Sequence, residues 1–556
     1  MDSLSDTIWD VTISGTGLPQ SLLALSGKKI LHVDRNDYYG GLEAALSLQE
    51  AEAWAERLGG GNTQSPIQNI TVNRVDQGHA SESGGTRASQ LAFSRAYSLS
   101  LSPQVIYTRS NILPALVSSK VYRQLDFLAV GSWWLYDDTE QGDTGEWNAS
   151  LSGKESPKSR LRKIPGGRED VFADETIDRR SMMSLMKFLK LAADPEACAS
   201  AIDDWSKTPF SIFLESQYKI PHSLQEPLLA LALSPSNTDA TLTKFALPNI
   251  HRHLTSIGIF GPGFGAVIPK WGGLAEISQV ACRASAVGGG VYVLKKGVVT
   301  IEQPNQQKSG GSTPTDPVSQ LSLLTLDEGE KVRTRWVLGS KWDLPPIKQE
   351  EPRNEDDART IACSITIVSG KLSTLFPSSR EGAPPPASAI VVFPIRTLLK
   401  DIAGSDTQAP ESKLPPVYLM IHSSDTGECP EGQCIVYGYI FHSATTEAHA
   451  YLQNAVKRLL LIVGEDPRPV QLWSMHYDRS FSNLSTLPEK PSTTSSDSYG
   501  GDHALKLPDV APGLALGDHV LKDVREAYRR IMGDNDDGFM IFEDREGAGE
   551  EADNSE

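Results

Sequence analysis

The chain is poor in cysteine, in long apolar runs and in positive charge. Its 556 residues include five scattered cysteines, and this odd number favours reduced thiols over a disulfide framework. The longest apolar runs are about the size of 228–233, far shorter than the roughly 20 residues of a membrane-spanning helix. The opening MDSLSDTIWD has neither the basic nor the apolar region of a secretory signal. We therefore expect a cytoplasmic protein without a membrane span.

Acidic residues exceed basic ones by 70 to 52, which gives a net charge of −18. Half of this excess lies in residues 533–556, where ten acids face one base, Arg545. Such a balance disfavours nucleic acid or an anionic membrane surface as a direct partner, because both repel it. We expect a disordered acidic tail over 533–556, with the apolar residues of GFMIFED (538–544) as an alternative short docking strip.

The remaining sequence predicts a mixed α/β fold with an inserted helical domain. The chain begins β-α-β and has many short β-branched runs, whereas the residues from Asp178 to about Ile257 follow a helical period. We assign 1–130 and 259–520 to a sheet domain and 165–258 to an all-helical domain. Segments rich in Gly, Ser and Pro are expected to be flexible insertions: 59–89, 137–160, 303–319, 345–358, 404–416 and 488–502.

An incomplete dinucleotide-binding turn stands at the start of the chain. In ISGTGLPQSLL, Gly15 and Gly17 match the first two glycines of G-x-G-x-x-G, but Gln20 replaces the third. The following helix is expected over 19–26, near the minimum length for a parallel crossover. Asp34 ends the second strand and could hold a ribose hydroxyl or could be a surface acid in a tight turn. The turn predicts a Rossmann-type fold that has lost its cofactor, with a bound flavin or nicotinamide as the alternative.

Several blocks of sequence carry a family resemblance. GTGLPQS and GKKILHVDRNDYYGG resemble the first sequence block of the Rab GDP dissociation inhibitor and Rab escort protein family. The resemblance continues in residues 94–136, 162–190 and 269–294, in the expected order, and these blocks cover about a fifth of the chain. It implies a flavoprotein-like, GDI-like multi-sheet domain that holds no cofactor. One departure is that the segment between Gly17 and Gly27 is about one helical turn shorter than is usual in the family.

The resemblance implies an accessory binding protein without catalytic activity. The Pro19 turn and the sequence VFADETIDRRSMMSLMKFLK look like the escort branch. An escort protein would bind GDP-bound Rab GTPases, present them to the heterodimeric geranylgeranyltransferase and carry the product, with its geranylgeranyl groups, to membranes. The alternatives are a GDP dissociation inhibitor that recycles prenylated Rabs and, less favoured, an FAD-dependent oxidoreductase.

Five residues are candidate binding positions. Glu276 and Arg283 are seven residues apart, which places both on one face of a predicted helix about 10 Å from each other. By the resemblance, Tyr39, Arg95, Glu276 and Arg283 would form the Rab-binding platform. The helical domain would bind the prenyltransferase and the isoprenoid, with Phe188 as an exposed aromatic contact.

Recognisable catalytic and metal-binding patterns are missing from the sequence. His251 and His253 are two residues apart, so on a helix they point to different sides and make a poor metal pair. Residues 261–267, GPGFGAV, lack the lysine of a phosphate-binding loop. We therefore predict neither a metal site nor a nucleophile.

Overall fold

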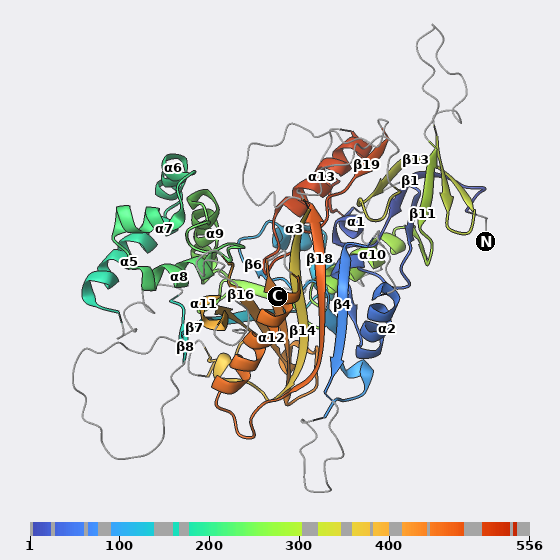
Figure 1. Cartoon of the computed structure of the whole chain (residues 1–556). Coiled ribbons are helices and arrows are strands. Elements are labelled where there is room, and N and C mark those ends of the chain that lie inside the picture. Colours follow the sequence, from blue (N-terminus) through green and yellow to red (C-terminus); the bar gives the residue numbers. More distant parts are fainter. Residues whose placement is uncertain are drawn as a thin grey trace, which may run out of the picture.

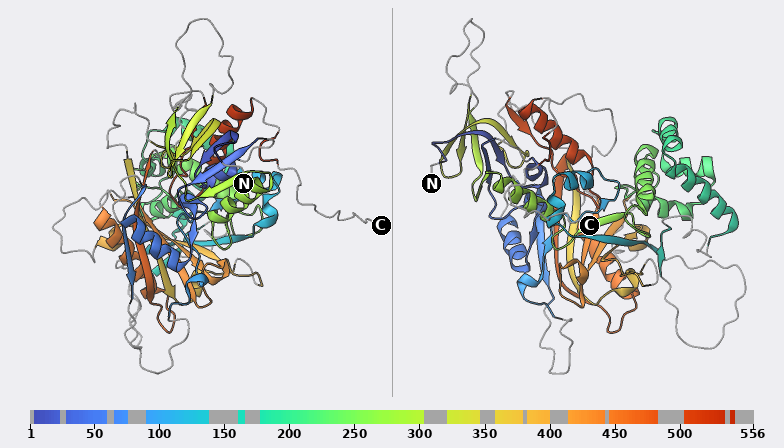
Figure 2. Two further views of the ribbon diagram at one scale, coloured as in Figure 1. Left: turned by 90° about the vertical axis from the view of Figure 1, so that its right-hand side faces the viewer. Right: turned by 180° about the vertical axis from the view of Figure 1, so that it is seen from behind.

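The computed structural model of the chain is elongated, with a helical cluster at one end, a seven-stranded sheet at the other and a larger sheet between them (Figure 1). The view from behind shows the same order of the three parts (Figure 2). The structure describes these residues: 4–23, 28–59, 65–75, 90–137, 160–165, 177–302, 321–345, 358–378, 382–399, 414–441, 445–482, 503–533 and 538–541.

The first sheet is the Rossmann-type part of the molecule. Its strands lie in the order β10-β2-β1-β13-β12-β11, and β19 pairs with β13. The pairs among β10, β2, β1, β13 and β19 are parallel, whereas β11 and β12 are antiparallel additions at one edge. The strands are β1 (Ile8–Ser14), β2 (Ile30–Asp34), β10 (Val291–Leu294), β11 (Val298–Glu302), β12 (Ser322–Leu326), β13 (Lys331–Gly339) and β19 (Ala504–Lys506).

Four helices cover one face of this sheet and enclose an apolar core. Helix α1 packs against α10 and α13, and residues of α3 join the same buried cluster as Val11 and Ile13 of β1. Helix α1 has five residues and ends at Leu22, whereas the sequence predicted a helix over 19–26, of which residues 24–26 lie outside the described part of the chain. The helices are α1 (Leu18–Leu22), α3 (Ile112–Ser118), α10 (Leu274–Val287) and α13 (His519–Met532).

The second sheet has ten strands and forms the centre of the molecule. Its order is β4-β18-β14-β17-β16-β15-β7-β9-β6, and β8 pairs with β7. Helix α12 (Thr445–Ile462) packs on one face, while α2 (Leu48–Gly59) packs against β4. Strands β3 (Ala45–Leu46) and β5 (Leu99–Ser100) form a separate small pair. The ten strands are β4 (Ile67–Arg74), β6 (Ile106–Tyr107), β7 (Phe127–Asp137), β8 (Arg160–Lys163), β9 (Ala266–Pro269), β14 (Ala358–Ser369), β15 (Ser388–Phe393), β16 (Val417–Ser423), β17 (Gln433–Ile440) and β18 (Gln471–Ser482).

The helical part follows from strong local signals. The Asp178 carboxylate accepts hydrogen bonds from the first backbone amides of α5, and Asp194 caps α6, where Pro195 takes the first helical position. Aromatic rings of this part pack edge to face around Phe188. The helices are α5 (Arg179–Ala193), α6 (Pro195–Trp205), α7 (Phe210–Phe213), α8 (His222–Leu231) and α9 (Thr243–Ser256). The predicted fold class, a multi-sheet α/β structure with an inserted helical part, is confirmed.

Two segments differ from their expected loop or tail character. Residues 67–74, inside the expected insertion 59–89, form the edge strand β4, which pairs with β18. In the acidic tail, Phe539 and Met540 are buried against α13, where the Phe539 ring contacts Tyr528 edge to face. Residues 303–319 and 488–502, and nearly all of 137–160, 345–358 and 404–416, lie outside the described residues. In the described part, every helix is too short or too polar to cross a membrane.

Candidate functional site

A groove of about 710 Å³ runs along the exposed face of α10. The helix buries Leu274, Ile277 and Ala281 against the first sheet, so residues three to four positions apart on its other side face solvent. The groove is lined by Tyr39, Gln124, Glu276, Gln279, Val280, Cys282, Arg283, Ala286, Gly290 and Tyr292. The structure therefore brings three of the four expected platform residues, Tyr39, Glu276 and Arg283, to one surface.

Glu276 and Arg283 give this groove a carboxylate and a guanidinium two helical turns apart. Arg283 is exposed, whereas Glu276 is half-buried. Burial raises the pKa of Glu276, and the nearby carboxylate of Glu428 raises it further. Charged groups at this spacing can each meet an opposite charge on a partner surface.

A buried network lies behind Glu276. Glu428 is fully buried, and its Oε2 atom lies 2.8 Å from Nδ1 of His422. The same oxygen accepts a hydrogen bond from the hydroxyl of Tyr437 at 2.8 Å. The Tyr437 hydroxyl accepts a hydrogen bond from the backbone amide of Ser100 at 3.1 Å. These bonds connect the large sheet to the small β3–β5 pair beside the groove.

Tyr39 stands at the wall of the groove with 38% of its surface exposed. Its ring lies 6.0 Å from that of Tyr292 in an edge-on arrangement, and Tyr292 stacks on His32 at 4.2 Å. Because Tyr292 and His32 come from the adjacent strands β10 and β2, the sheet itself positions this aromatic wall.

Arg95 is placed outside the groove. It is exposed on a 3-10 turn, Ser94–Ala96, near the start of α2, where the Ser94 hydroxyl accepts a hydrogen bond from the amide of Gln49. The four expected platform residues thus divide into a group of three around the groove and Arg95 apart from them.

The glycine turn is occupied by carboxylates of the chain itself. Oε2 of Glu43 accepts a hydrogen bond from the amide of Leu18 at 3.0 Å, at the start of α1 where a dinucleotide pyrophosphate would bind. The Asp343 carboxylate lies against Gly15, so close that a Cβ on this glycine would stand 2.6 Å from Oδ2. Gln20, the residue in place of the third glycine, donates from Nε2 to Oδ2 of Asp343 at 3.0 Å.

These groups do not fit a flavin dinucleotide. Burial raises the pKa of Glu43 to about 6 and, with help from Asp34 and Asp509, that of Asp343 to about 7. Asp34 accepts a hydrogen bond from Thr16 at 2.6 Å and is also bonded by Asn36, so its oxygens are already engaged. The remaining cavity of about 120 Å³ is below the roughly 300–1,000 Å³ of cofactor-sized pockets. A pyrophosphate would meet the Glu43 carboxylate, which is mostly ionised at pH 7, and too little space.

Phe188 is fully buried, which corrects the expectation of an exposed aromatic contact. Its ring lies 6.0 Å from that of Phe210 and 5.6 Å from that of Tyr218. The large apolar side chain that α5 exposes is that of Met183, at 60%. Phe188 therefore holds the helices of this part together.

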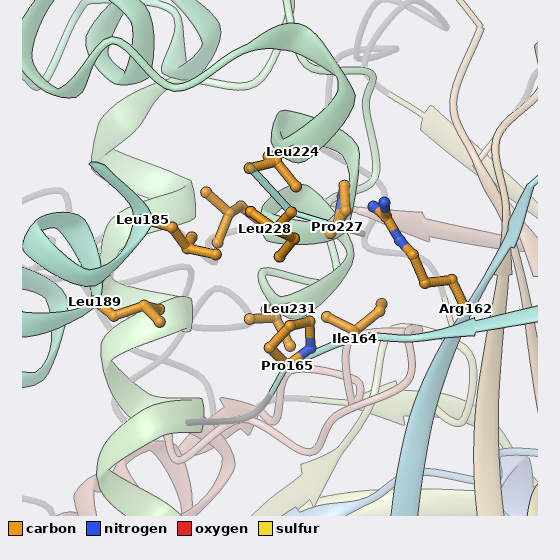
Figure 3. A pocket seen from close by; sticks show the side chains of 10 residues that line it. Arg162, Ile164, Pro165, Leu185, Leu189, Leu224, Pro227, Leu228 and Leu231 are labelled. Atoms are coloured by element: carbon orange, nitrogen blue, oxygen red, sulfur yellow. The ribbon is translucent and has the colours of Figure 1, made fainter. Parts of the chain in front are cut away.

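A small apolar pocket lies between α5, α8 and the segment 162–165 (Figure 3). Leu185 and Leu189 point into it from α5, and Leu224, Leu228 and Leu231 from α8 (Figure 3). Its volume is about 10 Å³, roughly one water molecule, so the side chains nearly close it. The residues could enclose a linear apolar chain only if α5 and α8 moved apart.

The two histidines His251 and His253 have separate partners. Nδ1 of His251 lies 2.8 Å from the carbonyl oxygen of Ala192, whereas His253 is buried beside Tyr107 and Trp133. Over the ranges that the structure describes, no group of three or more His, Cys, Asp and Glu side chains is arranged to hold a metal ion.

The sequence did not reveal the carboxylates at the glycine turn or several of the residues that line the groove. Glu43 and Asp343 lie 300 positions apart, and only the fold brings them to one glycine turn. Gln279, Tyr292 and Gln124 could have been found in part: Gln279 stands between Glu276 and Arg283 on the helical period, and the other two lie in the resembling blocks.

A family model and several curated proteins match this chain over much of its length. The family model described as "GDP dissociation inhibitor" matches residues 5–74 and 69–334. A Candida albicans protein named "Rab proteins geranylgeranyltransferase component A" is 26% identical over 462 residues, which cover 81% of this chain and 62% of that protein. A Schizosaccharomyces pombe protein named as an uncharacterized Rab geranylgeranyltransferase is 24% identical over 505 residues, 86% of this chain and 94% of that protein. The chain spans about three fifths of the length of the first curated relatives that it matches.

A solved structure supports the same fold. The crystal structure of a Rab GDI from Plasmodium falciparum has a TM-score of 0.57 and 17% sequence identity, and the match covers 94% of this chain and 98% of that one.

Proposed function

We propose a function that starts from one premise: this chain belongs to the GDP dissociation inhibitor family. Within it, the chain acts as a Rab escort protein. It binds newly made, GDP-bound Rab GTPases, presents them to a separate geranylgeranyltransferase and delivers the prenylated product to membranes. The names of its relatives support the escort branch, because they include component A of the Rab geranylgeranyltransferase.

The observation that carries the proposal is the groove on α10. Tyr39, Glu276 and Arg283 line it together, and their aromatic, acidic and basic groups suit a protein surface with complementary charges better than a small apolar ligand. Arg95 would contact a more distant part of the GTPase, since it lies outside the groove. The four residues remain our proposed GTPase-binding positions.

The helical part is proposed to serve the transferase and the isoprenoid. Met183 replaces Phe188 as the proposed contact on α5, because a flexible thioether side chain adapts to irregular apolar partners. The pocket between α5 and α8 is the proposed shelter for a geranylgeranyl group, after opening.

The chain's contribution to prenylation is positioning. Chemistry on the cysteines of the GTPase would belong to the transferase. By holding the GTPase and the transferase at once, the chain would convert a weak encounter into an intramolecular one with a high effective concentration.

A prenylation assay tests this function. GDP-loaded Rab, geranylgeranyltransferase and the isoprenoid diphosphate are combined with and without the chain. We expect prenylated Rab only when the chain is present. Binding of Rab without support of prenylation would favour the recycling inhibitor, and a failure to bind any Rab would reject both.

A further inference from the structure

Trp271 occupies a backbone conformation that is unfavourable for its side chain. Its φ angle is +77°, and the amide of Gly272 donates to the carbonyl of Lys270 at 3.1 Å. A bond between residues two apart around a positive φ defines the classic γ-turn, which is rare and strained. Such strain is commonly found at functional sites, because the surrounding structure must maintain it.

The surrounding chain holds this turn from two sides. The backbone amide of Trp271 donates a hydrogen bond to the carbonyl oxygen of Thr426 at 2.8 Å. The amide of Lys270 donates to the carbonyl oxygen of Asp126, also at 2.8 Å. The Trp271 ring lies directly against Gly427, where any Cβ would collide with it. Gly427 has a φ of +78°, so this position requires glycine for two reasons.

The held tryptophan is nevertheless exposed. It retains 51% of its surface, and Nζ of Lys270 lies 4.6 Å from the ring centre. A cation over the ring and a glycine beneath it fix the orientation of the indole before any partner arrives, which lowers the entropy cost of binding. Tryptophan is among the residue types that are most enriched at the energetic hot spots of interfaces.

Trp271 lies just before the end of α10 that carries Glu276 of the groove. It directly precedes Gly272, and a Cβ at Gly272 would stand 3.0 Å from Oε1 of Glu276. Trp271 and the groove carboxylate of Glu276 therefore both belong to the N-terminal end of α10, which begins at Leu274.

We propose that Trp271 is a further contact residue of the GTPase-binding surface, where it receives an apolar side chain of the GTPase beside Glu276. This inference rests on the proposed function. It adds a residue that has an apolar role and sits outside the four positions expected from the sequence.

The test uses the full chain and one GDP-loaded Rab GTPase. Trp271→Gly removes the ring and suits the positive φ, so we expect an unfolding temperature within about 2 °C of the wild type and an affinity that is roughly tenfold lower or worse. Trp271→Ala removes the ring but keeps the Cβ, so its backbone strain should not exceed that of the tryptophan; it should bind as weakly and provides a second variant. Leu461→Ala, which truncates a 57% exposed apolar residue on α12, is the matched control and should bind normally.

Two failures can be separated. If the wild type binds the GTPase and Arg283→Glu weakens binding, but both Trp271 variants bind like the wild type, the inference about Trp271 is overturned while the proposed function stands. If the wild type binds no Rab GTPase, the proposed function itself fails.

Discussion

The carboxylate of Glu43 accepts a hydrogen bond from the backbone amide of Leu18, so an acid of the chain occupies the anion-binding end of the helix after the glycine turn. On its other side, Oε1 of Glu43 lies 3.6 Å from Nη2 of the buried Arg479. The turn therefore keeps its affinity for negative charge but satisfies it within the chain. In this chain, the position at which a dinucleotide-binding turn would hold a pyrophosphate is a structural contact.

This contact predicts that the chain does not bind a flavin dinucleotide. Added FAD should leave the unfolding temperature unchanged, because the pyrophosphate would have to displace Glu43 and approach Asp343. Differential scanning fluorimetry with and without excess FAD makes the measurement. A ligand-dependent rise, together with a yellow protein after purification, would contradict it.

Asp343 predicts a pH dependence of stability. Burial raises its pKa to about 7, far above the ordinary value of 3.8, so between these values the folded chain holds a proton that the unfolded chain has released. Its contribution to stability is greatest below the ordinary pKa and is lost as the pH rises through about 7. Asp34, Asp509, Arg35 and Ser340 are the groups that act on it.

Asp343→Asn should remove this dependence, because an amide does not titrate. We compare the free energy of unfolding of the variant with that of the wild type at each pH. The variant's value minus the wild-type value should be larger at pH 8 than at pH 5, by on the order of 1–3 kcal/mol. Urea unfolding of both proteins at the two pH values measures the difference. A difference that is equal at both pH values would show that Asp343 titrates normally.

Charge reversal at Arg283 should weaken Rab binding without affecting the fold. The side chain is exposed on α10, so Arg283→Glu should change the unfolding temperature little and lower the affinity roughly tenfold or more. Arg468→Glu, at an exposed arginine on the loop after α12, is the control with the same change of charge. Equal affinity of the two variants would remove Arg283 from the binding surface.

Phe188 should prove structural. Phe188→Ala leaves a cavity among Phe210, Tyr218 and their neighbours, and we expect a loss of about 3–5 kcal/mol of stability. Met183→Ala on the same helix truncates an exposed side chain and should leave stability within about 0.5 kcal/mol. Chemical denaturation separates them, and pull-down of the transferase tests whether Met183 is a contact. A stable Phe188→Ala variant would mean that this aromatic cluster is not packed as described.

The segment 538–541 should contribute to the stability of the fold, although it belongs to the acidic region 533–556. Phe539 is buried against Tyr528, and the guanidinium of Arg525 lies 4.9 Å from the Phe539 ring centre. Phe539→Ala is expected to destabilise the chain by about 2–4 kcal/mol, whereas Ile541→Ala, at a 55% exposed position, should not. Equal stabilities would indicate that the segment 538–541 is not docked.

The sequence by itself determined the features that depend on local periodicity and contiguous motifs. The period of α10 placed Glu276 and Arg283 on one face, and the contiguous blocks identified the family. These signals are local, because helix formation and turn geometry are set by residues a few positions apart.

The tertiary structure alone decided which side chains are covered and which distant groups meet. It buried Phe188, separated Arg95 from the groove, paired β4 with β18 and brought Glu43 and Asp343 to the glycine turn. Burial and long-range contacts depend on which elements pack against each other, and a residue's neighbours along the chain do not encode them. For the same reason an amphipathic helix predicts its apolar face, but the identity of what covers that face is settled only by the assembled fold.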